Sequence, residues 1–198
     1  MEVTYLGQAV DTSRRMLDQF WDPEGGGCFL YSKHGEQLIS RPKEIYDGAL
    51  PSGNSMAAVV LSRLSRLTGE ASWQQAAHRQ LSYLTGAIRS HPLGHSMALL
   101  AVSQAVYPSY ELVCVTTEET APAQLTAHLL KNPLPNLTLL LKTSGNQAEL
   151  ETAAPFTGSY PIPQRGAMYY LCHNGACAAP TDDLSALLDP LSPQTGKR

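Results

Sequence analysis

Two different hydrophobic patterns share this chain, and the change from one to the other falls near Tyr107 and Pro108. Before that point, apolar residues recur at the spacing of helices that bury one face. Beyond it, residues 111–116 are rich in β-branched side chains and residues 137–141 form a short apolar run, and both features are typical of buried strands. We therefore predict a mainly α fold with an α/β addition: a helical region at 1–108 and a small α/β region at 109–198.

Turn residues predict where the first helix ends. Asp22 is followed by a proline and, shortly after, by three glycines, so the helix is expected to end near Trp21. The glycines indicate a sharp turn, because no strand precedes them and no Gly-Lys-Ser/Thr follows, as a phosphate-binding loop would require. Residues 28–31 and 37–39 are interpreted as the strands of a small hairpin.

Cap residues delimit a second helix more sharply. Ser52 is its predicted N-cap, residues 54–67 carry its apolar stripe, and Gly69 lies just past its end. Because only residues 68–70 separate it from the next helix, we expect these two helices to form an antiparallel hairpin. The third helix is expected at about 72–89, and a fourth between Pro92 and Val106.

The second region predicts a βαβ unit. A helix at 123–130, with Pro122 at its start, separates the two expected strands, which should therefore pair in parallel. Residues 144–164 are mainly loop with a weak helical stretch at 147–151, and residues 167–172 are a third strand. Thr181 is the predicted cap of a last short helix, 182–188.

Charge and hydropathy exclude several classes of function. The net charge is -3, with no run of basic residues, so nucleic acid is not an expected partner. The apolar runs are far shorter than the ~20 residues that cross a bilayer, and the N-terminus lacks a signal-peptide pattern. We expect a cytoplasmic protein without membrane contact, with its cysteines reduced and with no cofactor.

The segment from Arg41 to Ser55 reads RPKEIYDGALPSGNS. Together with FWD and EGGG before it, RLSRLTG after it and the late strings CHNGAC and PTD, it resembles the YyaL-like, spermatogenesis-associated thioredoxin-domain family. The resemblance implies a partial α/α toroid of the six-hairpin glycosidase-like kind, related in shape to N-acylglucosamine 2-epimerases. It covers nearly the whole chain.

The resemblance places this chain at the C-terminal part of such a protein. The family's thioredoxin-like domain and its earlier helical hairpins have no counterpart here, so no thioredoxin active site is expected in this chain. A second copy or a partner chain would supply the missing hairpins. Two departures from the family pattern are Cys28, where an aromatic residue is common, and His173, where an acidic residue is common.

The same segment concentrates candidate site residues. Glu44 and Asp47 are the candidate general acid and base, and the candidate substrate-binding residues are Arg41, Lys43, Tyr46, Ser52 and Asn54. Polar groups that converge beside aromatic rings suit a carbohydrate-like molecule. We predict that Glu44, Tyr46, Asp47 and Asn54 share one concavity. The alternative is a scaffold in which the cations pair with the carboxylates and Ser52 starts the helix.

Cys172 and Cys177 form a C-x4-C pattern. We expect a structural, metal-free pair that packs in the strand and the following turn, while a thiol redox pair and a metal site with Cys114 and His173 are the alternatives. No metal ligand set is predicted. His95, near the start of an apolar helix, is interpreted as structural, with a pocket residue as the alternative.

Two functions from different classes remain. The first is epimerase or glycoside chemistry in a carbohydrate-type pocket, as the resemblance implies. The second is a non-catalytic interaction module that binds a partner chain or a second copy through apolar helix faces. The second function predicts that the isolated chain self-associates or is only marginally stable.

Overall fold

The computed structural model describes residues 2–36, 39–173 and 175–191, and it divides the chain into two compact units, Thr4–Tyr107 and Pro108–Arg198 with Met1–Val3. The chain is mixed α/β, as predicted at this coarse level. Its helices and strands, in chain order, are α1 Val3–Phe20, α2 Gly53–Thr68, α3 Ala71–Ser90, α4 Ser96–Val106, β1 Tyr110–Thr116, α5 Ala123–Lys131, β2 Leu137–Lys142, α6 Gln147–Ala153, β3 Ala167–His173, β4 Ala176–Cys177 and α7 Leu184–Leu188.

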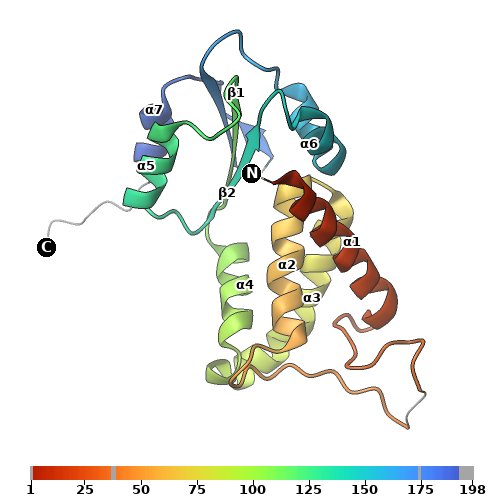
Figure 1. Ribbon diagram of the computed structural model, residues 1–198. Coiled ribbons are helices and arrows are strands. Elements are labelled where there is room, and N and C mark those ends of the chain that lie inside the picture. The colour runs from red at the N-terminus through yellow and green to blue at the C-terminus, as the bar shows by residue number, and fades with distance from the viewer. Residues whose placement is uncertain (1, 37–38, 174, 192–198) are drawn as a thin grey trace, which may run out of the picture. The chain divides into compact units, whose positions relative to one another are not determined.

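Helix α2 is the centre of the helical unit, because it packs against both α3 and α4 (Figure 1). Leu61 and Leu64 of α2 meet Val10 of α1 and Trp73 of α3 in one apolar cluster. A second cluster joins α2, α3 and α4, and its buried members are Ala58, Val59, Leu84, Ile88, Ala98 and Ala101. The buried residues of α3 fall at the apolar spacing on which its prediction depended. Helix α4 instead buries the small Ala98 and Ala101, while Leu100 and Val106, on which its prediction depended, are exposed.

The predicted end of α2 is confirmed. Gly69 adopts a left-handed conformation with φ 71°, and its N–H donates to the Ser65 carbonyl. Glycine reaches this conformation without steric cost, so the chain reverses at once into α3. Helices α2 and α3 lie side by side, as the predicted hairpin requires (Figure 1).

The predicted hairpin of residues 28–31 with 37–39 does not form in the described residues. Cys28 makes a single antiparallel bridge to Trp21, and the N–H groups of Phe29 and Leu30 donate to Phe20 and Pro42. Gln37 and Leu38 lie outside the described residues. The segment therefore runs back along the end of α1 and is bonded to Pro42, not to the predicted second strand of the hairpin.

The glycine-rich turn sits tightly against α3. Gly27 has φ 77°, and a Cβ built there would lie 2.5 Å from a ring carbon of Tyr83. Both the backbone conformation and the space require glycine at this position.

Gly27→Ala is therefore expected to lower the free energy of unfolding by about 2 kcal/mol, because the new methyl group is strained and overlaps the tyrosine ring. Gly86→Ala in α3 is the matched control. Its Cβ meets nothing within 4 Å, so it should be neutral or stabilising by about 0.5–1 kcal/mol. Chemical denaturation measures both changes, and equal effects of the two substitutions would contradict the packing described here.

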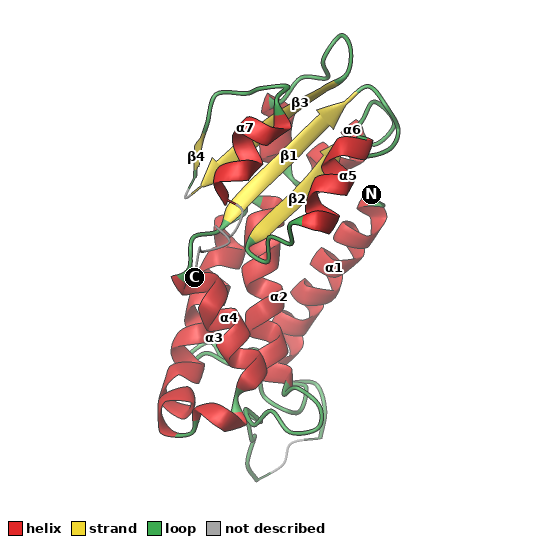
Figure 2. Cartoon of the chain, turned by 90° about the vertical axis from the view of Figure 1, so that its left-hand side faces the viewer, coloured by secondary structure: helices red, strands yellow, loops and turns green. Residues whose placement is uncertain are grey.

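The second unit is built on a four-stranded sheet of described residues in the order β2-β1-β3-β4 (Figure 2). Strands β1 and β2 pair in parallel, which confirms the predicted βαβ unit. Strand β3 pairs antiparallel to β1, and the short β4 pairs antiparallel to β3 at the sheet edge. Helices α5 and α7 cover one face of the sheet, and α6 lies on the other (Figure 1).

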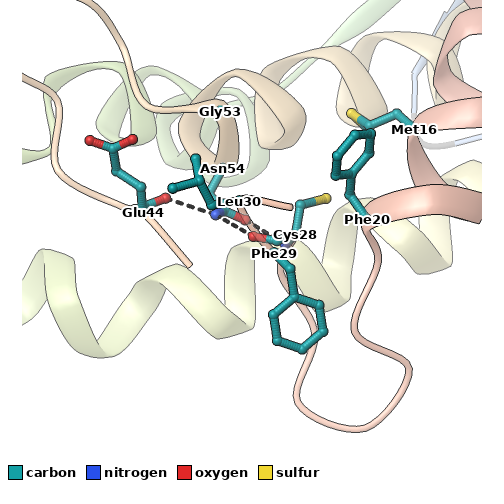
Figure 3. A pocket seen from close by; sticks show the side chains of 8 residues that line it. All are labelled: Met16, Phe20, Cys28, Phe29, Leu30, Glu44, Gly53 and Asn54. Carbon is teal, nitrogen blue, oxygen red and sulfur yellow. Dashed lines mark hydrogen bonds between the residues drawn. The ribbon is translucent and has the colours of Figure 1, made fainter. Parts of the chain in front are cut away.

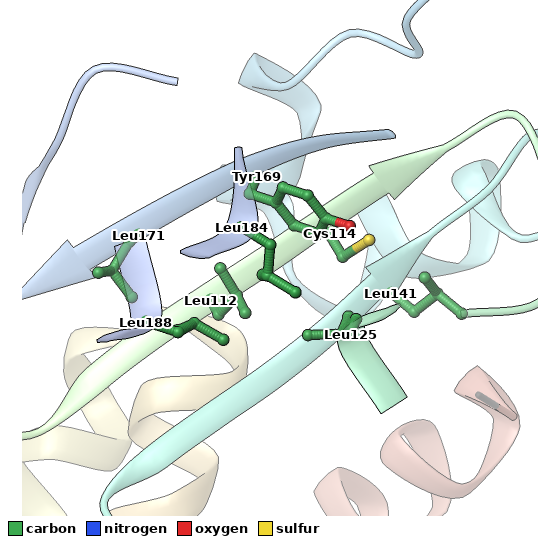
Figure 4. Close-up of a cluster of buried hydrophobic side chains, with 8 residues drawn as sticks. All are labelled: Leu112, Cys114, Leu125, Leu141, Tyr169, Leu171, Leu184 and Leu188. Atoms are coloured by element: carbon green, nitrogen blue, oxygen red, sulfur yellow. The ribbon is translucent and has the colours of Figure 1, made fainter. Parts of the chain in front are cut away.

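The face toward α5 and α7 carries the main apolar cluster of this unit (Figure 4). Alternate residues of each strand point into it, as the strand period of two requires. The buried members are Leu112, Cys114, Leu125, Leu141, Tyr169, Leu171, Leu184 and Leu188. The N-cap of α7 differs from the prediction: Asp183 accepts from Ser185 and Ala186, while Thr181 accepts from the Asp183 N–H.

Candidate functional site

Asp47 is buried and uses both carboxylate oxygens as acceptors for backbone N–H groups. Its Oδ1 accepts from Ser52 at 2.8 Å, and its Oδ2 accepts from Met97 at 2.9 Å and Ala98 at 3.2 Å. Met97 and Ala98 lie in the first turn of α4, where N–H groups have no partner within the helix. His95 at the N-cap position of α4 makes no side-chain cap bond, so the carboxylate of Asp47 caps this helix from a loop distant in sequence.

These bonds also set the ionisation of Asp47. Burial by itself raises the pKa of the carboxyl group, but hydrogen bonds from Ser52, Ser55, Ala98 and Met97 together outweigh it, so the pKa lies below its ordinary value. A negative charge at the start of α4 is also favoured by the helix dipole. Asp47 is thus an ionised cap at neutral pH.

Asn54 is 3% exposed and is bonded through both ends of its amide. Its Oδ1 accepts from the Cys28 N–H at 2.6 Å and from Gln80 Nε2 at 2.9 Å, and its Nδ2 donates to the carbonyl oxygens of Cys28 at 2.9 Å and Glu44 at 2.7 Å. One side chain of α2 therefore holds the strand-like segment at Cys28, the loop at Glu44 and helix α3 together.

Ser52 is the N-cap of α2, as predicted. Its hydroxyl oxygen accepts from the Ser55 N–H at 3.1 Å and lies 2.9 Å from the Ser55 hydroxyl, while its own N–H donates to Asp47. The side chain is buried in this cap. The same turn thus starts α2 and positions Asp47 for α4.

Lys43 contacts the glycine-rich turn, and Arg41 contacts the segment that follows this turn. Lys43 Nζ pairs with Asp22 Oδ2 at 2.6 Å, and both side chains are less than one-fifth exposed. Its hydrogen bond is the main cause that lowers the pKa of Asp22 to about 2. Arg41 donates to the Tyr31 carbonyl at 3.1 Å, and its guanidinium lies 4.0 Å from the centre of the Phe29 ring.

Low pH should therefore destabilise the chain. The folded-state pKa of Asp22 is about 2, and that of Asp47 also lies below the ordinary value of 3.8. The stabilisation from both groups is therefore present above about pH 4 and is lost as the pH falls through their folded-state pKa values. Thermal unfolding followed across this range should show a falling midpoint. In the Asp47→Asn variant the midpoint should fall less steeply with pH. An unchanged dependence of the midpoint on pH would contradict the assignment of Asp47 as an ionised cap.

Tyr46 is 58% exposed, and its ring edge faces His95 at 6.5 Å between ring centres. His95 is buried, and its Nδ1 is 2.8 Å from the carbonyl oxygen of Ile45. The imidazole thus ties the YDG segment to the start of α4, which agrees with the structural interpretation of His95. Gly94 leaves space for the rings of Tyr46 and His91, because a Cβ at Gly94 would lie 2.8 Å from each of them.

A hollow of about 200 Å³ lies in the helical unit beside this loop (Figure 3). Its lining residues are Met16, Phe20, Cys28, Phe29, Leu30, Glu44, Gly53 and Asn54. Most of the lining is apolar. The Glu44 side chain is exposed, and its carboxylate extends away from Asn54 and the rest of the lining, while the Glu44 main-chain carbonyl faces Asn54 (Figure 3).

The structure divides the predicted site residues into two groups. Glu44 and Asn54 line the hollow, whereas Tyr46 and Asp47 are not among its lining residues. The other predicted residues contact backbone and neighbouring side chains: Arg41, Lys43 and Ser52.

Sequence reasoning missed several residues that build the site. Phe20 and Met16 lie on α1, and their helical spacing of four was a signal that they share a face. Asp22 and Gln80 are bonded to Lys43 and Asn54, and no local signal pairs residues so far apart in the chain.

Cys172 and Cys177 are joined by a disulfide, so the expectation of reduced thiols is not met for this pair. The antiparallel pairing of β3 with β4 places them opposite each other. Cys28 and Cys114 are buried free thiols, and burial raises the pKa of Cys28 to about 11 and of Cys114 to about 12. Among the described residues, no group of three or more His, Cys, Asp or Glu side chains is arranged to hold a metal ion.

These features define a protein with a helical unit that holds a small, mainly apolar hollow and a separate unit with a mixed sheet. Within the part of the chain that the structure describes, no helix has both the length and the apolar character to cross a bilayer. No protein-family model matches the chain.

The chain is homologous to spermatogenesis-associated protein 20. It is 28% identical to the human protein over 176 residues, which cover 88% of this chain, and 29% identical to the mouse protein over 185 residues, which cover 92%. The rat protein is 29% identical over 166 residues, or 83% of this chain. The matched part spans only 22%, 23% and 21% of the human, mouse and rat proteins.

Proposed function

We propose that the helical unit contributes a binding hollow for a carbohydrate-type ligand, within a family that includes spermatogenesis-associated protein 20. The observation that carries the proposal is the lining itself: the rings of Phe20 and Phe29 offer apolar surface, and Glu44, an exposed acidic residue, is also part of the lining. Sugar rings present an apolar face and a rim of hydroxyl groups, which suits this combination.

The proposal is for binding, not for a two-carboxylate reaction. Glycoside chemistry of the common kind needs two carboxyl groups that flank one bond. Asp47 is occupied by three backbone N–H groups and does not line the hollow, so in this proposal it positions α4 and the loop. Glu44 is then the residue that contacts ligand hydroxyls.

In the same proposal, helices α1 to α4 are hairpins of an α/α toroid. Support comes from the packing of α2 against α3 and against α4, with two apolar clusters between these helices and α1. The further hairpins that such a ring requires would come from outside residues 1–198.

The binding proposal is tested by blocking the hollow. Gly53 lines it, and a Cβ at Gly53 meets nothing within 4 Å, so Gly53→Leu should fill the space without a backbone clash. Gly86→Leu adds the same side chain at another open helical position and is the matched control. The probe is a panel of neutral and N-acetylated monosaccharides at millimolar concentration, followed by amide chemical shifts of the labelled protein.

We expect at least one sugar to shift the Phe29, Leu30, Gly53 and Asn54 signals in the unmodified chain and in Gly86→Leu, but not in Gly53→Leu. Glu44→Gln should weaken the response, because it removes the charge of the proposed acceptor. Absence of any shift across the panel, or shifts that persist in Gly53→Leu, would refute the proposal.

A second candidate function, self-association or binding of a partner chain, is favoured by exposed apolar residues on α4. Leu100 is 54% exposed and Val106 is 72% exposed, and Leu93 just before the helix is 90% exposed. Apolar groups that recur on one short helix favour association. Sedimentation of the chain distinguishes a monomer from a dimer, and a Leu100→Glu, Val106→Glu double variant should shift any dimer to monomer.

A further inference from the structure

The Cys172–Cys177 disulfide has one buried and one exposed end. Cys172 lies in β3 and is 7% exposed, whereas Cys177 lies in the exposed two-residue strand β4. Strand β4 is at the edge of the sheet, beside β3 (Figure 2). A nucleophile from solvent therefore reaches the Cys177 sulfur far more easily than the Cys172 sulfur.

A tyrosine hydroxyl lies against both sulfurs. The Tyr160 hydroxyl oxygen is 3.6 Å from Cys172 Sγ and 3.5 Å from Cys177 Sγ. At these distances the O–H group is placed to donate to either sulfur. The sequence places Tyr160 in a loop rich in Gly, Pro, Thr and Ser, and nothing in that pattern pointed to the cysteines.

Contacts other than those with the disulfide also hold Tyr160 in place. Its backbone carbonyl accepts from Lys142 Nζ at 2.8 Å, and its ring stacks on Tyr170 with 4.2 Å between ring centres. Lys142 is only 1% exposed, and it also donates to the Thr157 carbonyl and pairs with Glu151 at 2.7 Å. A buried cation thus fixes the segment that carries the hydroxyl.

We propose that Cys172 and Cys177 form a thiol–disulfide exchange site whose substrate is the dithiol of a partner protein. A thiolate of the dithiol attacks Cys177 Sγ, a new S–S bond forms to Cys177, and the Cys172–Cys177 bond breaks with its electron pair on Cys172. The second thiol of the partner loses its proton to solvent, and the resulting thiolate attacks the partner's first sulfur, which is bonded to Cys177. The bond to Cys177 breaks, and Cys177 leaves as a thiolate. Two electrons and two protons pass from the dithiol, which becomes a disulfide, to the cysteine pair.

Tyr160 is the catalytic residue of this site, because its hydroxyl contacts the reacting sulfurs. It donates a hydrogen bond to the Cys172 thiolate as the bond breaks, and a better stabilised leaving group leaves faster. Cys28 and Cys114 are separate from this chemistry, since both are buried and hold their protons at neutral pH. They are internal controls in any labelling experiment.

The direction of attack is tested with two matched variants, Cys172→Ser and Cys177→Ser, and with 5,5′-dithiobis(2-nitrobenzoate) as the probe. The remaining Cys177 thiol of the first variant should react at least about tenfold faster than the remaining Cys172 thiol of the second, because of its exposure. Circular dichroism checks that both variants fold. Equal rates, or faster reaction of Cys172, would refute attack at Cys177.

The role of Tyr160 is tested in the chain that keeps both cysteines. Dithiothreitol is the probe, and mass spectrometry after alkylation measures the rate at which the pair is reduced. Tyr160→Phe keeps the ring stack and should slow reduction about fivefold, the effect of one hydrogen bond on the leaving sulfur. As a control for stability, the thermal unfolding midpoints of the unmodified chain and of Tyr160→Phe, both oxidised, should agree closely. An unchanged rate would refute the catalytic role, and a disulfide that resists dithiothreitol in the folded chain would refute the exchange site itself.

Discussion

Replacing Asp47 by alanine is expected to lower the free energy of unfolding of the chain by about 3 kcal/mol. The substitution removes the acceptors of three backbone N–H groups, those of Ser52, Met97 and Ala98. Loss of a helix cap costs about 0.5–2 kcal/mol, and a buried N–H left without an acceptor costs about 1–3 kcal/mol. The cost should be large because one carboxylate serves the starts of both α2 and α4.

Urea denaturation at neutral pH measures this effect. Asp47→Asn keeps one oxygen acceptor and should lose about half as much. Asp11→Ala, an exposed aspartate of α1, is the control and should change the free energy of unfolding by no more than about 0.5 kcal/mol. If Asp47→Ala is no more destabilising than Asp11→Ala, then Asp47 is not the cap that the geometry indicates.

Replacing Asn54 by aspartate, a side chain of nearly the same size, is expected to lower the free energy of unfolding by about 4 kcal/mol. The new carboxylate oxygen would face the carbonyl oxygens of Cys28 and Glu44, which now accept from the Asn54 amide. Two hydrogen bonds are lost, and a charge is buried without a cation. Because burial raises the pKa of such a carboxyl group, the loss should shrink as the pH falls and the group is protonated.

The comparison for this variant is Gln74→Glu, the same amide-to-acid change at an exposed position of α3. It should alter the free energy of unfolding by no more than about 0.5 kcal/mol. Unfolding curves at neutral and mildly acidic pH give both the size and the pH dependence. If Asn54→Asp lowers the free energy of unfolding no more than Gln74→Glu, or if its effect grows as the pH falls, the Asn54 amide does not hold these segments together as described.

Local signals in the sequence predicted the elements well. Ser52 and Gly69 bound α2 as expected, because a cap depends on residues within one turn of the helix end. The parallel pairing of β1 with β2 followed from the helix between them. Two predictions were wrong: Asp183 caps α7 in place of Thr181, and residues 28–31 form no hairpin, because their backbone partners lie at Phe20 and Pro42.

The candidate site was predictable only as a segment. Sequence reasoning placed its polar residues together at the start of α2, but their individual roles depend on contacts that local patterns do not contain. Asp47 meets Met97 and Ala98, about 50 residues away, and Lys43 meets Asp22. A carboxylate can serve as a helix cap, an ion-pair partner or a catalytic group, and only its neighbours in the fold decide which of these roles it has.

Amide hydrogen exchange is the measurement that tests most directly whether the loop at residues 41–52 is held by the side chains of Asp47 and Asn54. The N–H groups of Cys28, Ser52, Met97 and Ala98 all donate to these two residues. In the unmodified chain they should exchange only on global unfolding, as slowly as core amides of α2. If these four amides exchange as fast as those of an unstructured loop, the side chains of Asp47 and Asn54 do not hold the loop, and the account of the site is wrong.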